Sequence, residues 1–121
     1  MVIGFKKQFV QPILSGTKIH TIREDKGNRW KAGKLIHFVT GYKQFKTGKC
    51  VSVQVVEITY HECIDPGEGD LFEVKIDGHV QNLAQIMRLC AFDGFDTIAE
   101  FMDWFNKDFS GKIIHWTDLR Y

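Results

Sequence analysis

The stretch Ile13-Leu14-Ser15-Gly16-Thr17-Lys18-Ile19-His20-Thr21-Ile22-Arg23 decides the expected fold. Apolar side chains recur at helical spacing over residues 9–14, and Gly16 suits the left-handed position that follows a helix. Residues 19–23 then form the next strand, and Lys18 lies in the turn before it. The stretch therefore predicts a short helix that stops at a glycine and leads at once into a strand.

Three polar side chains of this stretch are expected to meet at one site. Thr21 and Arg23 share one face of a strand, because side chains two residues apart point the same way. Lys18 has the opposite parity, so it joins them only if it lies in the bend before the strand becomes regular. An ammonium, a guanidinium and a hydroxyl together suit a phosphate, a carboxylate or a polarised carbonyl.

The hydrophobic pattern on either side predicts further strands. The expected strands cover residues 2–5, 19–23, 35–40, 50–60, 71–76, 79–81 and 112–117. In the longest of them the Val55-Val56 pair breaks the alternation and predicts a bulge. The Asp77-Gly78 pair is typical of a two-residue hairpin turn. Residues 41–48 are expected to be a basic turn region, and residues 61–70 a loop.

Two helices are expected late in the chain. Apolar side chains recur at helical spacing over residues 83–90 and 98–105, and Thr97 with Glu100 predicts a capping box before the second helix. The aromatic residues expected in or near the core are Phe101, Trp104, Phe105 and Trp116. Consecutive strands without helical crossovers favour antiparallel pairing. The expected fold class is therefore α+β, with a mixed, mainly antiparallel, barrel-like sheet and helices packed against it.

Length and composition fit a single domain over residues 1–121, since 44% of the residues are hydrophobic. Cys50, Cys63 and Cys90 are widely spaced and odd in number, which is typical of reduced thiols inside a cell. The first residues do not resemble a signal peptide, and no apolar stretch approaches the ~20 residues that span a bilayer. We expect a cytoplasmic protein without a membrane partner.

The net charge of +1 hides an uneven distribution of charge. Residues 1–49 carry eleven Lys and Arg against two acids, whereas residues 50–121 carry five against thirteen. One explanation is a basic surface that binds an anionic partner. The other is that the two parts of the chain pair with each other across the fold.

Familiar catalytic and cofactor motifs do not occur. No set of Cys and His has the spacing of zinc ligands, and the nearest cluster is His61-Glu62-Cys63. The nucleophile elbow and the glycine-rich dinucleotide turn are missing as well. Gly48-Lys49-Cys50 lacks the glycine spacing and the Ser or Thr of a phosphate loop. We expect no metal and no cofactor.

The order helix–Gly–x–Lys–x–x–Thr–x–Arg in residues 13–23 resembles the signature of ASCH domains, which belong to the PUA-like superfamily. The similarity continues through Trp30-Lys31-Ala32-Gly33-Lys34 and extends to Asp93-Gly94-Phe95, so it covers most of the chain. The resemblance implies a PUA-like pseudo-barrel with flanking helices. It also implies a cleft beside residues 19–23 that is the right size for a nucleotide or part of an RNA strand.

The first function that the resemblance implies is an RNA- or nucleotide-binding module. Lys18, Thr21 and Arg23 would line the cleft, Trp30 would stack on a base, and Lys31 would be one of the flanking basic residues. The other flanking bases would be Lys6, Lys7, Arg29 and Lys34. A tryptophan that packs back on its own domain is an equally good interpretation of Trp30.

The second function is that of a family branch which removes the acetyl group from N4-acetylcytidine with a lysine, a threonine and a glutamate. Carried over by position, the lysine falls on Lys18, the threonine on Thr21, and the glutamate near Asp93. Lys18 would activate Thr21 or a water, and Asp93 would handle the proton for the leaving amine. The sequence departs from that branch here, because Asp is one methylene shorter than Glu. A ribonuclease is a further alternative, and whether the chain is an enzyme stays open.

Each candidate residue also has a purely structural interpretation. Lys18 would be a solvated turn lysine and Thr21 an ordinary strand residue. Arg23 would pair with a carboxylate of the protein. Asp93 would be a polar residue at a helix end, where Gly94 completes the turn. The sequence leaves the natural ligand and the oligomeric state open.

Overall fold

The structure is a computed structural model that describes residues 1–61 and 71–121. The helical elements are a 3-10 turn η1 (Lys7–Phe9), α1 (Val10–Ser15), α2 (Leu83–Phe92) and α3 (Ile98–Trp104). The strands are β1 (Val2–Gly4), β2 (His20–Arg23), β3 (Leu35–Thr40), β4 (Lys43–Lys49), β5 (Ser52–His61), β6 (Leu71–Ile76), β7 (His79–Val80) and β8 (Phe109–His115). The expected order of elements is confirmed, with one strand added.

The strands form two sheets within the described ranges. One has the order β1-β3-β4 and the other the order β2-β8-β5-β6-β7. Only β1 and β3 run parallel among these pairs, while the others are antiparallel. The fold is therefore α+β with two mainly antiparallel sheets. The described strands do not close into a barrel, so the pseudo-barrel stays a prediction.

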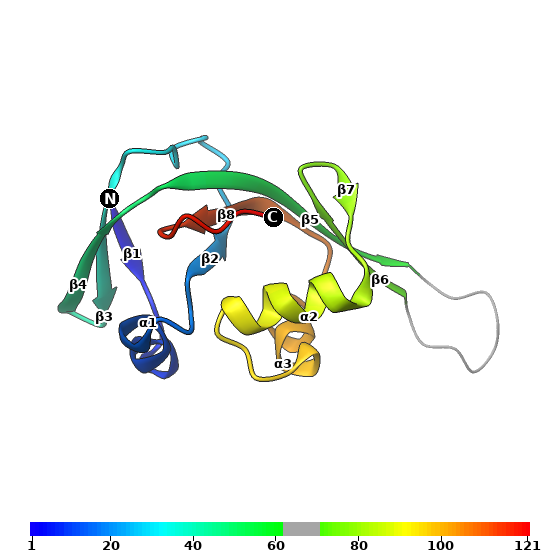
Figure 1. Cartoon of the computed structure of the whole chain (residues 1–121), viewed down its shortest axis with the longest axis horizontal. Helices are drawn as coiled ribbons and strands as arrows, with labels where there is room; N and C mark the ends of the chain where they lie inside the picture. Colours follow the sequence, from blue (N-terminus) through cyan, green and yellow to red (C-terminus); the bar gives the residue numbers. More distant parts are fainter. Residues whose placement is uncertain (62–70) are drawn as a thin grey trace.

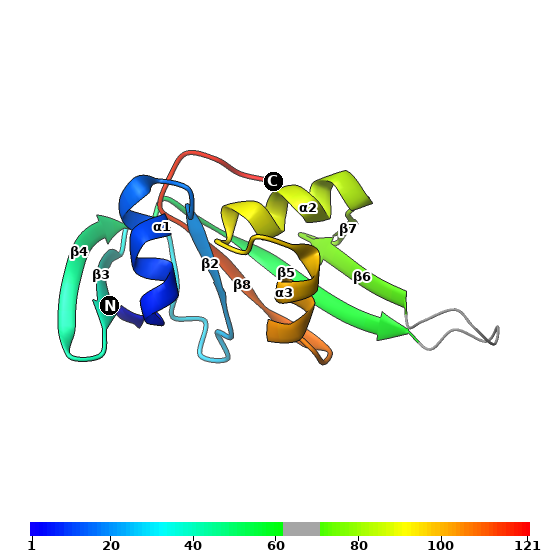
Figure 2. The same cartoon turned by 90° about the horizontal axis from the view of Figure 1, so that it is seen from below.

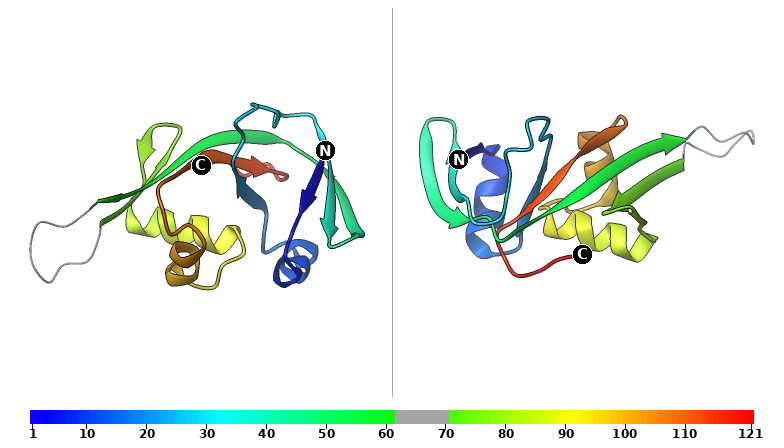
Figure 3. Two further views of the ribbon diagram at one scale, coloured as in Figure 1. Left: turned by 180° about the vertical axis from the view of Figure 1, so that it is seen from behind. Right: turned by 90° about the horizontal axis from the view of Figure 1, so that it is seen from above.

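The helices lie together on the concave side of the arch formed by β5 and its neighbours (Figure 1). The view from behind shows the same arrangement (Figure 3). Seen from below, α1 lies on one side of β2, and α2 with α3 lies on the other (Figure 2). β2 therefore runs between two helical flanks. In the part of the chain described, no helix is both long enough and apolar enough to cross a bilayer.

The helix ends follow capping residues. α1 ends where Gly16 adopts a left-handed φ of 84°, as expected from the sequence. The Thr97 hydroxyl accepts a hydrogen bond from the Glu100 N–H at the start of α3, but the Glu100 carboxylate accepts from Asp96 instead of Thr97. The predicted capping box is thus half formed. A complete box that we did not predict, Asn82 with Gln85, starts α2.

Two local predictions are wrong. The expected turn region at 41–48 is largely strand β4, which pairs antiparallel with β3. Strand β4 has a single large apolar side chain, Phe45, so no hydrophobic alternation indicates a strand in the sequence. Its hydrogen bonds with β3 hold it in the extended conformation. The Val55-Val56 pair forms no bulge, since β5 stays in register with β8 from Ser52 to Ile58. Gln54 takes the buried position instead, and Val55 faces outward.

The expected loop at 61–70 lies outside the described residues, apart from His61 at the end of β5. Cys63 and most of the His61-Glu62-Cys63 cluster lie there too. Cys50 and Cys90 are buried free thiols. The Asp77-Gly78 turn is confirmed, because both residues have the positive φ values, 50° and 82°, that this hairpin turn requires.

Candidate functional site

The chain before β2 brings Lys18 against the end of α2. The N–H groups of Thr17 and Lys18 both donate to the carbonyl of Pro12, at 3.0 Å each, so the chain bends sharply after α1. The Ile19 N–H then donates to the Phe92 carbonyl at 2.9 Å. Lys18 thus lies in the bend before β2, which is the position that it needs in order to share a site with Thr21.

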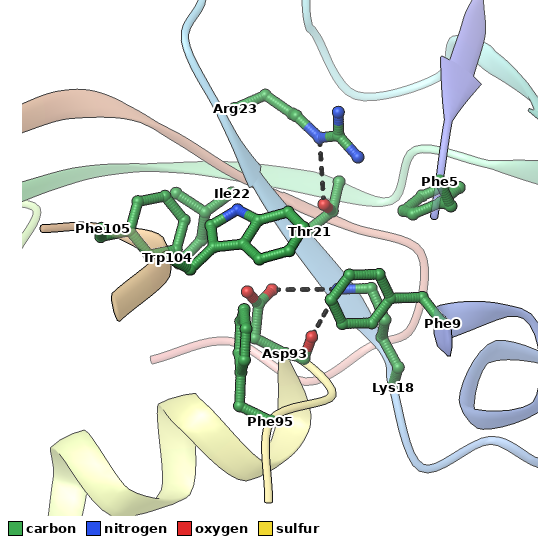
Figure 4. A pocket seen from close by; sticks show the side chains of 10 residues that line it. All are labelled: Phe5, Phe9, Lys18, Thr21, Ile22, Arg23, Asp93, Phe95, Trp104 and Phe105. Carbon is green, nitrogen blue, oxygen red and sulfur yellow. Dashed lines mark hydrogen bonds and ion pairs between the residues drawn. The ribbon is translucent and has the colours of Figure 1, made fainter. Parts of the chain in front are cut away.

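The Lys18 ammonium is buried, with 2% of the residue exposed. Its Nζ donates to the Asp93 carbonyl at 2.5 Å, to the His20 carbonyl at 2.8 Å and to the Asp93 Oδ1 atom at 3.3 Å. It also lies 4.9 Å from the centroid of the Phe9 ring. Three N–H donors therefore meet three oxygen acceptors. Figure 4 shows the two contacts with Asp93. Lys18 is not a solvated turn lysine.

Opposing effects act on the charge of Lys18. Burial lowers the pKa of Lys18, because the loss of water disfavours the ammonium, and the nearby Arg23 lowers it further. The Asp93 carboxylate opposes this through its charge and its hydrogen bond. The pair is therefore suited to hold a charge next to a ligand or to exchange a proton with it.

Asp93 is held at the C-terminal end of α2, where it is 3% exposed. Gly94 follows with a φ of 93°, a conformation that side chains disfavour. A Cβ atom on Gly94 would also lie only 3.0 Å from the Lys18 Cδ atom and 3.1 Å from the Phe9 Cδ1 atom. Glycine is therefore needed here for its backbone angle and for the close approach of Lys18.

Thr21 and Arg23 are joined on β2, as their shared face predicted. The Arg23 Nε–H donates to the Thr21 hydroxyl at 3.2 Å, and Arg23 Nη2 donates to the Gly4 carbonyl at 2.8 Å. The guanidinium lies over the Phe5 ring, 5.1 Å from its centroid. No carboxylate pairs with Arg23 among the described residues, so part of its guanidinium can reach a ligand.

These four polar residues line one pocket (Figure 4). Its other walls are Ile22 and the aromatic side chains of Phe5, Phe9, Phe95, Trp104 and Phe105. The cavity itself has a volume of about 70 Å³. That volume is well below the range of about 300–1,000 Å³ for small-molecule sites, so the cavity can hold only a small group of a ligand.

The aromatic walls have different exposures. Phe9, Phe95 and Trp104 meet edge to face, with centroids between 5.4 and 5.7 Å apart. Phe9 and Phe95 are buried, whereas Trp104 is 42% exposed. Trp104 was expected to be core or near-core, and the structure instead gives its indole a free surface beside the pocket. Phe101 and Phe105 are buried as expected.

A second, more open hollow of about 330 Å³ adjoins the pocket. It shares Ile22, Arg23, Trp104 and Phe105 with the pocket and continues over residues 106–109. Arg23 therefore lies between the small aromatic pocket and a more open surface. A ligand could place a small group in the pocket and its larger part in the second hollow.

Trp30 and Lys31, which we expected in the ligand site, do not join the others. Trp30 is 6% exposed and belongs to the hydrophobic core, and its backbone N–H donates to the Asp25 carboxylate at 2.9 Å. Lys31 is exposed, and neither residue lines the pocket. The structure thus favours the packing interpretation of Trp30, and Trp104 is the tryptophan at the pocket.

The uneven charge distribution is not explained by pairing within the described residues. Lys18, through Asp93, is the only Lys or Arg of residues 1–49 that forms an ion pair there. The bases expected to flank the cleft do not line the pocket, although Lys6 Nζ lies 4.8 Å from the centroid of the Trp104 ring. Among the described residues, the other Lys and Arg side chains of residues 1–49 therefore have no carboxylate partner.

Within the described ranges, no group of three or more His, Cys, Asp and Glu side chains could hold a metal ion. Searches of protein-family models, curated proteins and solved structures find no match to this chain. What the site can do must therefore be inferred from its own chemistry.

Proposed function

We propose that this chain is an ASCH domain of the PUA-like superfamily whose pocket binds a nucleotide, either free or within an RNA strand. One observation carries the proposal. Arg23 and Thr21 line a small aromatic pocket, and this pocket adjoins a second hollow that continues along the surface. The resemblance of residues 13–23 to the ASCH signature supports the same assignment.

The chemistry of the pocket fits the parts of a nucleotide. Aromatic side chains stack on any base, and the exposed face of Trp104 is available for this. A guanidinium binds phosphate through paired N–H donors, and Arg23 has N–H groups without a partner among the described residues. The base would lie against Trp104 with its edge towards the pocket, and the phosphate would lie by Arg23 in the second hollow.

A PUA-like pseudo-barrel belongs to the same proposal. The two sheets are linked where β4 passes into β5: the Cys50 N–H donates to the Lys34 carbonyl at 2.8 Å, and the Val51 N–H donates to the His115 carbonyl at 2.8 Å. These bonds connect β3 and β4 with β8. They support a continuous, strongly curved sheet surface in place of two independent layers.

Binding is tested by titrating the protein with cytidine 5′-monophosphate and with a labelled single-stranded RNA at several salt concentrations. We expect the RNA affinity to fall steeply as salt rises, because phosphate contacts release counterions. Arg23→Gln should weaken binding, whereas Arg88→Gln, on the exposed face of α2, is the matched control. Absence of binding at low salt, or salt-independent binding, would rule out the proposal.

The second candidate is an amidohydrolase acting on an N-acylated nucleoside such as N4-acetylcytidine. It is favoured by the buried contact of Lys18 with Asp93, beside the Thr21 hydroxyl. Thr21 or a water would attack the acyl carbonyl and give its proton to the free amine of Lys18. The resulting ammonium would pass this proton, through the Asp93 carboxylate, to the leaving amine. If Thr21 attacks, a water would then hydrolyse the acyl ester on Thr21 and release the acid. Burial supports this role, since it lowers the pKa of Lys18 and so favours the free amine.

Hydrolysis is tested by incubating the pure protein with N4-acetylcytidine and following cytidine by chromatography. We expect release by the wild type and none by Lys18→Ala, with Thr21→Val as the isosteric test of the hydroxyl. Circular dichroism must show that each variant is folded. Turnover that survives Lys18→Ala would refute the assignment. The same preparations, incubated with single-stranded RNA, test the ribonuclease alternative.

We also propose that the protein works in the cytoplasm. The free, buried thiols of Cys50 and Cys90 support a reducing compartment. Fractionation of cells that express the tagged chain tests this, and recovery of the chain in a membrane or secreted fraction would contradict it.

A further inference from the structure

His20 contacts the Asp93 carboxylate from outside the pocket lining. The imidazole is fully buried on β2. Its Nδ1 atom lies 3.0 Å from the Asp93 Oδ1 atom, the same oxygen that Lys18 reaches. Its Nε2 atom lies 2.5 Å from the Tyr121 hydroxyl oxygen. A continuous hydrogen-bonded chain therefore runs from Tyr121 through His20 to Asp93 and Lys18.

The direction of this chain follows from its end members. Burial raises the pKa of the Tyr121 phenol above its ordinary value, and the charge of Asp93 raises it further. The phenol therefore keeps its proton at neutral pH, and its O–H donates a hydrogen bond to His20 Nε2. The imidazole then carries its proton on Nδ1, and this N–H donates a hydrogen bond to the Asp93 carboxylate, which can only accept. The other tautomer would leave a ring lone pair facing a carboxylate.

Tyr121 is itself held by a buried side chain of β5. The Tyr121 N–H donates to Gln54 Oε1 at 2.8 Å, and the Tyr121 backbone oxygen accepts from Gln54 Nε2 at 2.7 Å. Gln54 Oε1 also lies 3.0 Å from His115 Nε2. This explains why a glutamine occupies a buried position of the strand, where an apolar residue would otherwise pack.

The groups around His20 come from four parts of the fold. Lys18 lies in the bend before β2, Asp93 faces His20 from the end of α2, and Tyr121 faces it from the segment after β8. The His115 ring of β8 packs edge to face against it at 5.3 Å. Burial first, and then the proximity of His20 and Arg120, lower the pKa of His115 to about 4, so His115 is neutral at pH 7.

We infer that His20 is a positioning residue of the pocket: anchored by Tyr121, it fixes the orientation of the Asp93 carboxylate against Lys18. A carboxylate that accepts from Lys18 alone could turn about its side-chain bonds. A second donor on the same oxygen removes that freedom and leaves the other oxygen of Asp93 towards the pocket. The inference rests on the proposed function only because a nucleotide is chosen as the test ligand.

Two substitutions separate positioning from packing. The amide of His20→Asn can take the place of Nδ1–H and still donate to Asp93, whereas the longer amide of His20→Gln reaches towards Tyr121. Both variants lose an aromatic ring in the same buried place, so a merely structural role predicts similar behaviour. Positioning predicts affinity for cytidine 5′-monophosphate close to wild type in His20→Asn and weaker on the order of tenfold in His20→Gln.

A second measurement needs no ligand. In ¹⁵N spectra of the imidazole rings, His20 of the free protein should show the Nδ1–H tautomer, and Tyr121→Phe should weaken that preference. The Nε2–H tautomer in the wild type, or equal affinities for His20→Asn and His20→Gln, would overturn the inference. If the wild type binds no nucleotide, the proposed function fails, and the tautomer alone then decides the role of His20.

Discussion

The Lys18 Nζ atom lies 3.3 Å from the Asp93 Oδ1 atom, although 75 residues separate the two along the chain. Both side chains are almost fully buried, at 2% and 4% exposure. Taking two charges out of water is costly, and the pair is stable only because backbone carbonyls and His20 satisfy the remaining donors and acceptors. The contact therefore determines how the site responds to mutation.

Removing one charge of this pair should cost more than removing both. Asp93→Asn leaves the Lys18 ammonium without a counter-charge and should destabilise the protein by about 3–5 kcal/mol in denaturant unfolding. The double variant with Lys18→Met should lose less than the sum of the single variants. The partly exposed pair Lys75–Glu73 is the control, because neutralising it should cost less than ~1 kcal/mol. Strictly additive losses for Lys18 and Asp93 would contradict this account.

Gly94→Ala should be more damaging than Gly78→Ala. Both glycines have positive φ, 93° and 82°, so both variants bear the strain of that backbone angle, about 1–3 kcal/mol. Only at Gly94 would the new methyl meet Lys18 and Phe9, since no atom lies within 4 Å of the corresponding position at Gly78. Thermal unfolding of the two variants measures the difference. Equal losses would mean that the close approach to Lys18 is unimportant.

The protein should lose stability as the pH falls from about 6.5 towards about 4. Burial lowers the pKa of His115 to about 4 from the ordinary value of 6.5, so below pH 6.5 the unfolded chain binds the proton more readily than the folded one. The contribution is fully present above pH 6.5, and the loss near pH 4 is on the order of 3 kcal/mol. Unfolding of wild type and His115→Asn across this range checks it, and parallel pH profiles would contradict it.

Trp104→Ala should weaken nucleotide binding with little effect on folding. The indole is 42% exposed, so its removal leaves the core largely intact. Loss of base stacking costs about 1–3 kcal/mol of binding energy, and Trp104→Phe should recover part of it. Quenching of tryptophan fluorescence by cytidine 5′-monophosphate, which should vanish in Trp104→Phe, provides a direct reading. Quenching that persists in that variant would place the ligand elsewhere.

The local parts of the site could be predicted because they depend on neighbours in the chain. Gly16 stops α1, the bend follows, and Thr21 and Arg23 share a face of β2. Asp93 could be proposed only through family resemblance. No local pattern connects it with Lys18, since the contact forms between segments far apart in the sequence.

The misses have a common physical cause. Trp104 was expected near the core because it is a large aromatic side chain, and its 42% exposure depends on which elements α3 packs against. His20 gave no signal, because its partners Asp93 and Tyr121 lie 73 and 101 residues away. The role of the buried Gln54 could not be predicted for the same reason, since its hydrogen-bond partners Tyr121 and His115 lie far away in the sequence.

β2 hydrogen-bonds with β8 in the described structure, and Thr21 pairs with Ile114 near the other end of the chain. A ribosome adds about 5–20 residues each second, so the first half of the pocket waits on the order of 5–20 seconds for its partner strand. During that time Lys18 and Arg23 have been synthesised, but the Asp93 carboxylate and strand β8, which hold them in the folded protein, have not. A nascent chain therefore completes the pocket only after β8 has been synthesised.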